Sequence, residues 1–407
     1  MIIRPARRTE SVQEYYFSRK LKEIDKMNSA RVAEGLPRVI NLGIGSPDGM
    51  PPAEAIDTLK ECASMPGTHA YQSYVGTPEL RKAFADWYAR YYGVTLSPDG
   101  EIQPLFGSKE GILLISMAFI NEGDKVLVPD PGYPTYTSAS RLVGAGILTY
   151  DLKEDNGWQP DFDALEKMDL DGVKIMWTNY PNMPTGGRAT KELYQRITDF
   201  GLRHNILIVN DNPYSFILND NPLSILASEG AKECCLELNS LSKAHNMSGW
   251  RVGMVAGSRE LISEVLKVKS QMDSGMFRPM QMAAVKALGQ GPEWFETLNA
   301  EYKVRREAAG KIFDLIGAKY DKESSGLFLW GRLDPGNPLL AKTSPQAGPD
   351  DRSLGEILSD RVLYEAGVFI TPGFIFGRNG RNYIRISLCA KPEVLAEALE
   401  KIRKITE

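Results

Sequence analysis

Short apolar runs, separated by turns rich in Gly and Pro, alternate with helical patterns along most of the chain beyond residue 39. These runs lack a regular alternation of apolar and polar side chains, which is typical of strands covered on both faces of a sheet. Strands interleaved with helices predict an α/β fold with a mainly parallel sheet. The runs that predict strands are residues 125–128, 146–150, 174–177, 206–209, 235–239 and 252–256.

The helical spacing of apolar residues predicts the main helices. Within residues 78–92, the side chains of Leu80, Phe84 and Trp87 share one face. The other predicted helices are residues 191–203, a long helix at 291–317, and an amphipathic terminal helix carrying Leu395, Leu399, Ile402 and Ile405.

The chain has 407 residues, and its pattern of apolar runs and turns changes after the long helix. Both features predict two domains. We expect a large domain at residues 53–295 and a smaller α+β domain at residues 296–407. Residues 1–52 would form an N-terminal arm and part of the small domain. The Pro- and Gly-rich residues 334–351 predict an exposed loop.

Composition narrows the class of protein further. The 48 Lys and Arg against 52 Asp and Glu give a net charge of −4, which is no reason to expect nucleic acid as a partner. Four Cys and three His without metal-binding spacing argue against a metal site and against a disulfide framework. No secretory signal is visible, and the apolar stretch at residues 112–120 is too short to span a bilayer. We therefore expect a soluble, cytoplasmic protein.

Two glycine-rich segments suggest nucleotide-binding loops, but both lack the required spacing. Residues 43–49 (GIGSPDG) are one residue too long for G-x-G-x-x-G, and residues 107–111 (GSKEG) lack the P-loop spacing. The second segment directly precedes an apolar helical run, so its free backbone N–H groups are suited to an anion. A simple helix cap is the alternative interpretation.

Several polar side chains lie at or beyond the ends of predicted strands, where α/β sheets place ligands. Asp211 follows one strand, with Tyr214 three residues later, and Tyr133 follows another. Lys243 lies in a turn of small polar residues, where a buried ammonium without a partner would be costly. Each of these residues also has a structural explanation, as a helix cap or an exposed turn.

A phosphate and a carboxylate are the ligands that the remaining candidates suit best. Ser240, Ser242 and Arg251 supply two hydroxyls and a planar guanidinium, a set suited to a phosphate. Arg385 lies inside an apolar run, where arginine usually pairs with a carboxylate, either structural or belonging to a substrate.

Seven motifs, taken together in chain order, indicate the protein family more specifically than any one of them does. In chain order they are Gly76-Thr-Pro-Glu-Leu-Arg81, Gly107-Ser-Lys109, Pro131-Gly-Tyr-Pro-Thr-Tyr136, Tyr180-Pro-Asn-Met-Pro-Thr-Gly186, Asp211-Asn-Pro-Tyr214, Ser240-Leu-Ser-Lys243 and Asn382-Tyr-Ile-Arg385. This order resembles the class I/II aminotransferases, pyridoxal-phosphate enzymes of the aspartate aminotransferase fold (fold type I). The chain looks most like the branch with aspartate, alanine and LL-diaminopimelate aminotransferases. The resemblance implies a seven-stranded sheet in the large domain.

The resemblance implies a role for each polar residue at the cofactor. Lys243 would form the internal aldimine and then move a proton at the substrate, while Asp211 would pair with the ring nitrogen. Tyr214 would donate to the phenolic oxygen, and Tyr133 would stack on the ring. The phosphate would be held by Ser108, the backbone of Lys109, Ser240, Ser242, Arg251 and, from the other subunit of a homodimer, Tyr71.

The resemblance also implies how a substrate would bind. Arg385 would take the α-carboxylate as a bidentate pair, and Gly45 would line the substrate pocket. Arg278 lies in a segment that, in this family, often reaches the neighbouring subunit's pocket. It would either bind a distal carboxylate, which favours dicarboxylic substrates, or form an interface salt bridge.

Met183 is the one clear departure from the family pattern, which usually has a second Asn at this position. A thioether cannot donate a hydrogen bond to the phenolic oxygen. Tyr214 would then make that contact alone, or Asn179 or Asn182 would replace the missing donor.

The function expected from the resemblance is a ping-pong transfer of an amino group from an L-amino acid to a 2-oxo acid. A C–S lyase acting by β-elimination would use the same cofactor residues and is the alternative. A non-catalytic sensor on this fold is a further alternative, and the presence of Lys243, Asp211 and Arg385 argues against it.

Overall fold

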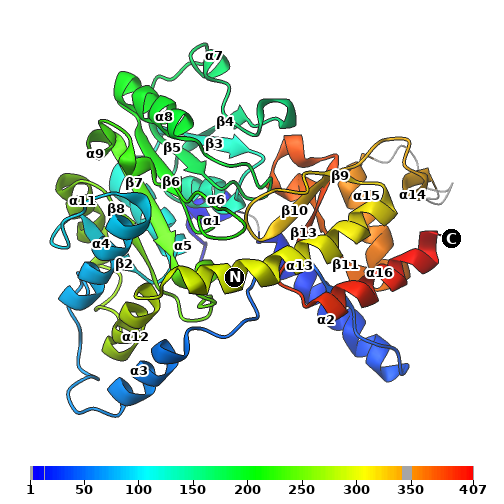
Figure 1. Cartoon of the computed structure of the whole chain (residues 1–407). Helices are drawn as coiled ribbons and strands as arrows, with labels where there is room; N and C mark the ends of the chain where they lie inside the picture. Colours follow the sequence, from blue (N-terminus) through cyan, green and yellow to red (C-terminus); the bar gives the residue numbers. More distant parts are fainter. Residues whose placement is uncertain (1–2, 13, 342–350, 407) are drawn as a thin grey trace.

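The computed structural model describes residues 3–12, 14–341 and 351–406, which form a larger and a smaller lobe (Figure 1). The larger lobe is built on a seven-stranded sheet in which only β8 runs antiparallel to its neighbours. This arrangement confirms the predicted α/β class and the mainly parallel sheet. In spatial order the strands are β2(Ile102–Leu105), β8(Gly253–Ala256), β7(Cys235–Ser240), β6(Leu207–Asp211), β5(Val173–Asn179), β3(Lys125–Asp130) and β4(Gly146–Asp151).

Both faces of this sheet are covered by helices, as the unbroken apolar runs predict. In β5, Ile175 and Trp177 pack on one face against α5(Ser108–Phe119), α6(Pro134–Leu142) and α11(Arg259–Lys269). Met176, between them, packs on the opposite face against α4(Pro78–Tyr92), α8(Lys191–His204) and α12(Arg278–Leu288). The remaining helical segments of this lobe are α3(Ala53–Ala63), α7(Phe162–Leu165), α9(Ala231–Cys234), α10(Leu241–Ala244), η1(Glu154–Asn156) and η2(Ile225–Ala227).

The smaller lobe combines both ends of the chain. Its four-stranded antiparallel sheet has the order β12(Thr371–Pro372), β13(Tyr383–Ser387), β10(Phe328–Arg332) and β9(Lys319–Tyr320). The N-terminal strand β1(Ile40–Asn41) pairs in parallel with β11(Val368–Phe369). The helical segments are α2(Tyr16–Ala33), α13(Pro292–Ile316), α14(Pro338–Ala341), α15(Leu354–Arg361), η3(Val362–Ala366), η4(Gly373–Phe376), η5(Arg378–Gly380) and α16(Pro392–Thr406). The short N-terminal helix α1(Arg7–Glu10) packs instead against α6 of the larger lobe.

The long helix α13 connects the two lobes, as Figure 1 shows. Its N-terminal Phe295 belongs to the core of the larger lobe, whereas Phe313 belongs to that of the smaller one. The domain boundaries at residues 52/53 and 295/296 stay a prediction.

The prediction of an exposed loop over residues 334–351 is wrong for part of that range. Residues 338–341 form the short helix α14, because Asn337 caps it by accepting from the backbone N–H of Leu339 at 2.9 Å. Residues 342–350 lie outside the described part of the chain. Across the described residues, no helix combines the length and apolar character that a membrane crossing requires.

Candidate active site

A cavity of about 580 Å³ lies where the larger sheet, the smaller lobe and the N-terminal segment meet. Its walls come from parts of the chain that are far apart in sequence. The carboxyl ends of β6 and β7 contribute Asp211 and Ser240, the smaller sheet contributes Arg385, and the N-terminal segment contributes Tyr15. Ligands bind at this edge of an open α/β sheet because the strand ends leave a crevice there.

Lys243 lies on the one-turn helix α10, directly after β7. Its Nζ donates a hydrogen bond to the backbone carbonyl of Gly45 at 2.6 Å. Burial lowers the pKa of the Lys243 ammonium, and the charges of Arg251 and Arg385 lower it further. A lowered pKa makes the neutral amine more accessible, which is the form that acts as a nucleophile or base.

Asp211 is the last residue of β6 and is only 5% exposed. Its Oδ2 accepts a hydrogen bond from the hydroxyl of Tyr136 at 2.9 Å, whereas no described group is hydrogen-bonded to Oδ1. Burial raises the pKa of this carboxyl to about 7, although the Tyr136 hydrogen bond opposes the shift. A buried carboxylate oxygen without a partner costs free energy that a cationic N–H donor would recover.

A cradle of hydroxyl and backbone groups lies at the start of α5. The Oγ of Ser240 donates to the Oγ of Ser242 at 2.8 Å, and Nη1 of Arg251 approaches the same Ser242 oxygen at 3.4 Å. Ser108 opens α5 and lines the same cavity. Since the N-terminus of a helix favours negative charge, this group suits a phosphate.

Gly107 lets the Arg251 side chain approach the start of α5 closely. Its φ of +83° is one that L side chains rarely adopt, and a Cβ there would lie 2.1 Å from Nη2 of Arg251. Arg251 itself has a φ of +58° and donates to the carbonyls of Ser248 and Phe106 at 2.9 and 3.2 Å. The glycine therefore lets the guanidinium reach the start of the helix.

Arg385 projects from β13, is 4% exposed and is packed among aromatic side chains. Its Cζ lies 3.8 Å from the ring centroid of Phe328 and 4.7 Å from that of Phe376. Nη2 donates to the carbonyl of Gly43 at 2.6 Å, while Nε has no hydrogen-bond partner among the described residues. Burial lowers the pKa of Arg385 to about 10, so the group stays cationic at neutral pH and is poised for an anion.

Met183 contacts Arg385 through its Sδ, at 3.3 Å from Nη1. Each of the two residues that could replace the missing donor already uses one amide N–H in a hydrogen bond. The Asn179 amide donates to the backbone carbonyl of Asp211 at 2.6 Å, and Asn182 donates to the carbonyl of Asn179 at 3.2 Å without lining the cavity. Tyr214 does line the cavity, and burial raises the pKa of its hydroxyl.

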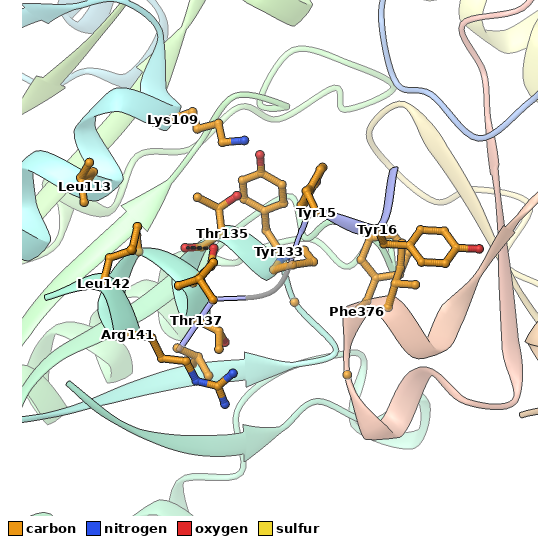
Figure 2. Close-up of a pocket in the computed structure, with 18 of the residues that line it drawn as sticks. Tyr15, Tyr16, Lys109, Leu113, Tyr133, Thr135, Thr137, Arg141, Leu142 and Phe376 are labelled. Atoms are coloured by element: carbon orange, nitrogen blue, oxygen red, sulfur yellow. Dashed lines mark hydrogen bonds between the residues drawn. The ribbon is translucent and has the colours of Figure 1, made fainter. Parts of the chain in front are cut away.

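Tyr133 and Lys109 stand between this cavity and a neighbouring one of about 940 Å³, which Figure 2 shows. The ring of Tyr133 meets that of Tyr136 edge to face, with centroids 5.5 Å apart. The Lys109 ammonium lies 5.0 Å from the ring centroid of Tyr15 and forms no ion pair within the described part of the chain. The N-terminal segment thus contributes an aromatic ring, Tyr15, to the walls of both cavities.

Two predicted residues lie outside the cavity. Tyr71 is 91% exposed, so its expected role would require a second chain. Arg278 opens α12, lines a separate small pocket, and lies 3.9 Å from Glu79 of its own chain. Within one chain, neither residue reaches Lys243 or Arg385.

Sequence reasoning assigned no role to several residues that the fold places at the site. Tyr136 supports Asp211, and Phe328 and Phe376 surround Arg385. The aromatic residues come from separate segments, so only their long-range contacts reveal them. Tyr136 could have been noticed as the last residue of the PGYPTY motif.

The residues present fit pyridoxal phosphate, the cofactor that the resemblance implies. The orphaned Oδ1 of Asp211 suits a protonated ring nitrogen, and the cradle around Gly107 suits a phosphate. The lysine that would carry the aldehyde lines the same cavity. The cofactor's three distinctive groups thus each meet a matching protein group.

Curated relatives share nearly the full length of the chain. An LL-diaminopimelate aminotransferase of Aquifex aeolicus is 37% identical over 385 residues, which cover 94% of this chain and 95% of the relative. One of Desulforudis audaxviator is 37% identical over 400 residues, covering 98% and 97%.

Solved structures of aminotransferase-like proteins have the same fold along nearly the whole chain. BacF from Bacillus subtilis, in its apo form, superposes with a TM-score of 0.90 at 33% identity and covers 100% of this chain and 99% of that one. A Thermus thermophilus aspartate aminotransferase double mutant has a TM-score of 0.86 at 23% identity, with 99% and 100% covered, and shows the shared fold. The profile of the family described as Aminotransferase class I and II matches residues 37–402, and the chain belongs to this family of pyridoxal-phosphate-dependent enzymes.

Proposed function

We propose that this aminotransferase works by a ping-pong cycle in which an amino donor and then a 2-oxo acid use the same Lys243–Arg385 site. The observation that carries this proposal is that Lys243, Asp211 and Arg385 line one cavity of about 580 Å³. Such a cavity holds one substrate at a time beside the cofactor. Consecutive use of one site is what a ping-pong cycle requires.

Pyridoxal phosphate, when bound, supplies an electron-accepting ring that weakens the bonds at the substrate's Cα. The side chains of the protein bind the cofactor and orient it. Ser108, Ser240, Ser242 and Arg251 would hold the phosphate, and Asp211 Oδ1 would hold a proton on the ring nitrogen. Tyr214 would donate to the phenolic oxygen, and Tyr133 would lie against the ring.

Arg385 and Lys243 would then divide the work on the substrate. Arg385 would bind the α-carboxylate through its guanidinium, which fixes the Cα–H bond relative to the ring. Lys243, whose pKa burial lowers, would take that proton on Nζ and hold it for return on the far side of the amino nitrogen. Gly45 would line the substrate pocket beside Lys243, and its lack of a side chain lets the Phe328 ring approach, since a Cβ there would lie 2.2 Å from that ring.

For the amino donor we propose an L-amino acid with a distal carboxylate, of the diaminopimelate type. Both curated relatives described above carry the name LL-diaminopimelate aminotransferase. Lys109 is a cation without an ion-pair partner among the described residues, and it lines both cavities at the rim of the site. A long dicarboxylate bound at Arg385 would extend toward this ammonium.

We also propose a homodimer with shared active sites. Tyr71, Tyr74, Met272 and Phe277 are large apolar side chains that are 91, 44, 50 and 41% exposed. Their segments lie together, since a Cβ on Gly275 would lie 2.4 Å from the carbonyl oxygen of Gln72. An exposed apolar surface of this kind is typical of a protein–protein interface.

A comparison of donors tests the proposed substrate class. In Lys109→Gln, which removes the charge and keeps a polar side chain one atom shorter, we expect KM for LL-diaminopimelate to rise about ten-fold, because a charged contact is worth about 1.5 kcal/mol. Alanine has no distal carboxylate and serves as the matched control, with KM changed less than about two-fold. Equal effects on both donors would contradict the proposed role of Lys109. Turnover of a donor without any 2-oxo acid would instead favour elimination chemistry.

A further inference from the structure

Residues 43–50, here called the carbonyl loop, hold two of the basic side chains of the active site, Lys243 and Arg385. The carbonyl of Gly43 accepts from Nη2 of Arg385, and the carbonyl of Gly45 accepts from Nζ of Lys243, each at 2.6 Å. The two residues that would bind the substrate's carboxylate and move its proton are therefore placed by one short segment. Any displacement of the carbonyl loop moves both of them.

Several side-chain contacts attach this loop to the rest of the chain. The hydroxyl of Thr371 donates to the carbonyl of Gly43, and the amide of Asn246 donates to the carbonyl of Met50, each at 3.2 Å. At its start, the backbone N–H of Gly43 donates to Oδ1 of Asn41 at 2.9 Å. Further along, Ser46 and Ser248 share a hydrogen bond at 3.2 Å. The ion pair between Asp48 and Arg305 is the strongest attachment, with Oδ1 and Nη1 2.6 Å apart.

Arg305 joins the carbonyl loop to the strand that carries Arg385. The same Nη1 donates to the carbonyls of Leu388 and Cys389, at 3.4 and 3.1 Å, just beyond the end of β13. Its side chain is 9% exposed and projects from α13, the helix that connects the two lobes. One guanidinium thus meets the carbonyl loop, the end of β13 and the long helix.

We propose that the Asp48–Arg305 pair is a positioning device that sets the placement of Lys243 and Arg385 for substrate binding. Neither residue lines the cavity, so the pair acts through the carbonyls of Gly43 and Gly45. Without the pair, the carbonyl loop keeps only neutral hydrogen bonds, such as those to Thr371 and Ser248, and its carbonyls hold Lys243 and Arg385 less firmly. Affinity for the amino donor then falls more than the rate of the chemical step.

This inference rests on the proposed roles of Lys243 and Arg385, so its first readout does not depend on activity. The readout is amide hydrogen exchange of Gly43, bonded to Asn41, and of Ser387, whose N–H donates to the carbonyl of Leu42 at 2.8 Å. In Asp48→Asn we expect about ten-fold faster exchange at both amides, with and without the cofactor. Asp48→Glu keeps the charge and should restore slow exchange.

The matched control lies one residue away on the same helix. Arg306 pairs with Glu323 at 3.1 Å, outside the cavity wall, and Glu323→Gln removes that charge in the same way. We expect exchange at Gly43 and Ser387 to be unchanged in this control. Indistinguishable exchange in Asp48→Asn and Glu323→Gln would overturn the proposal.

Steady-state kinetics of the loaded enzyme gives the second readout. Asp48→Asn should raise KM for the amino donor about ten-fold while kcat changes less than about two-fold, and Asp48→Glu should recover most of the loss. An equal fall in kcat at unchanged KM would overturn a positioning role. If the wild-type enzyme transaminates no donor, the proposed function fails, whereas the exchange comparison still decides the role of the ion pair.

Discussion

Asp211 combines near-complete burial with a carboxylate oxygen that lacks a hydrogen-bond partner among the described residues. Burial raises the pKa of this group to about 7 from a usual 3.8. A raised folded-state pKa stabilises the fold at pH values below 3.8, and this contribution is lost as the pH rises through 7. A cofactor that donates a proton to Oδ1 would remove the penalty.

The pH dependence of unfolding without the cofactor tests this account of Asp211. Relative to Asp211→Asn, we expect the wild-type protein to lose about 3 kcal/mol of unfolding free energy between pH 5 and pH 8. Urea unfolding of both proteins at several pH values measures the difference. Parallel pH profiles would show that Asp211 ionises without penalty.

Residues that sequence alone could predict were those with a fixed place in an ordered motif. Lys243, Asp211 and Arg385 stand in such motifs, and the structure brings them to one cavity. Phe328 and Arg305 stand in no motif, and the segment that contains Asp48 does not reveal its partner, because these contacts join residues far apart in sequence. Long-range contacts of this kind depend on how the lobes pack.

Elements were predictable where the hydrophobic pattern was continuous. The helix predicted at residues 78–92 is α4 with the same bounds, since Thr77 caps its start and Gly93, with a φ of +66°, ends it. The strand β2 was missed because its four residues include Gln103 and Pro104. As an edge strand of the sheet, β2 tolerates the proline.

The start of α5 is the element on which cofactor binding depends most directly in this account. Gly107→Ala forces a Cβ against Arg251 in addition to the strain of a positive φ, so we expect the dissociation constant for pyridoxal phosphate to rise at least ten-fold. Gly93→Ala is the matched control, because Gly93 has a similar φ of +66° with no atom within 4 Å of its Cβ. Fluorescence titration with the cofactor measures both variants. Equal weakening would assign the effect to backbone strain alone.

At the scale of the whole molecule, the proposed dimer makes a prediction about mixtures of inactive chains. Lys243→Ala removes the reacting amine, and Tyr71→Ala removes a residue that would reach the neighbouring site. A hybrid dimer of the two would contain one site with both residues intact. After mixing under exchange conditions, we expect up to about a quarter of wild-type activity per total chain. Absence of any recovery, with hybrid dimers demonstrated, would show that Tyr71 serves its own chain or no site.

The central claim is that Lys243 holds the cofactor and passes amino groups through it in two half-reactions. The visible absorption spectrum of the purified, cofactor-loaded protein tests this claim most directly, with LL-diaminopimelate, aspartate, glutamate and alanine added in turn. We predict that one donor bleaches the visible band without a 2-oxo acid and that a 2-oxo acid then restores it, while Lys243→Ala shows neither change. A band that no amino donor bleaches, or a Lys243→Ala protein that cycles like the wild type, would contradict the account.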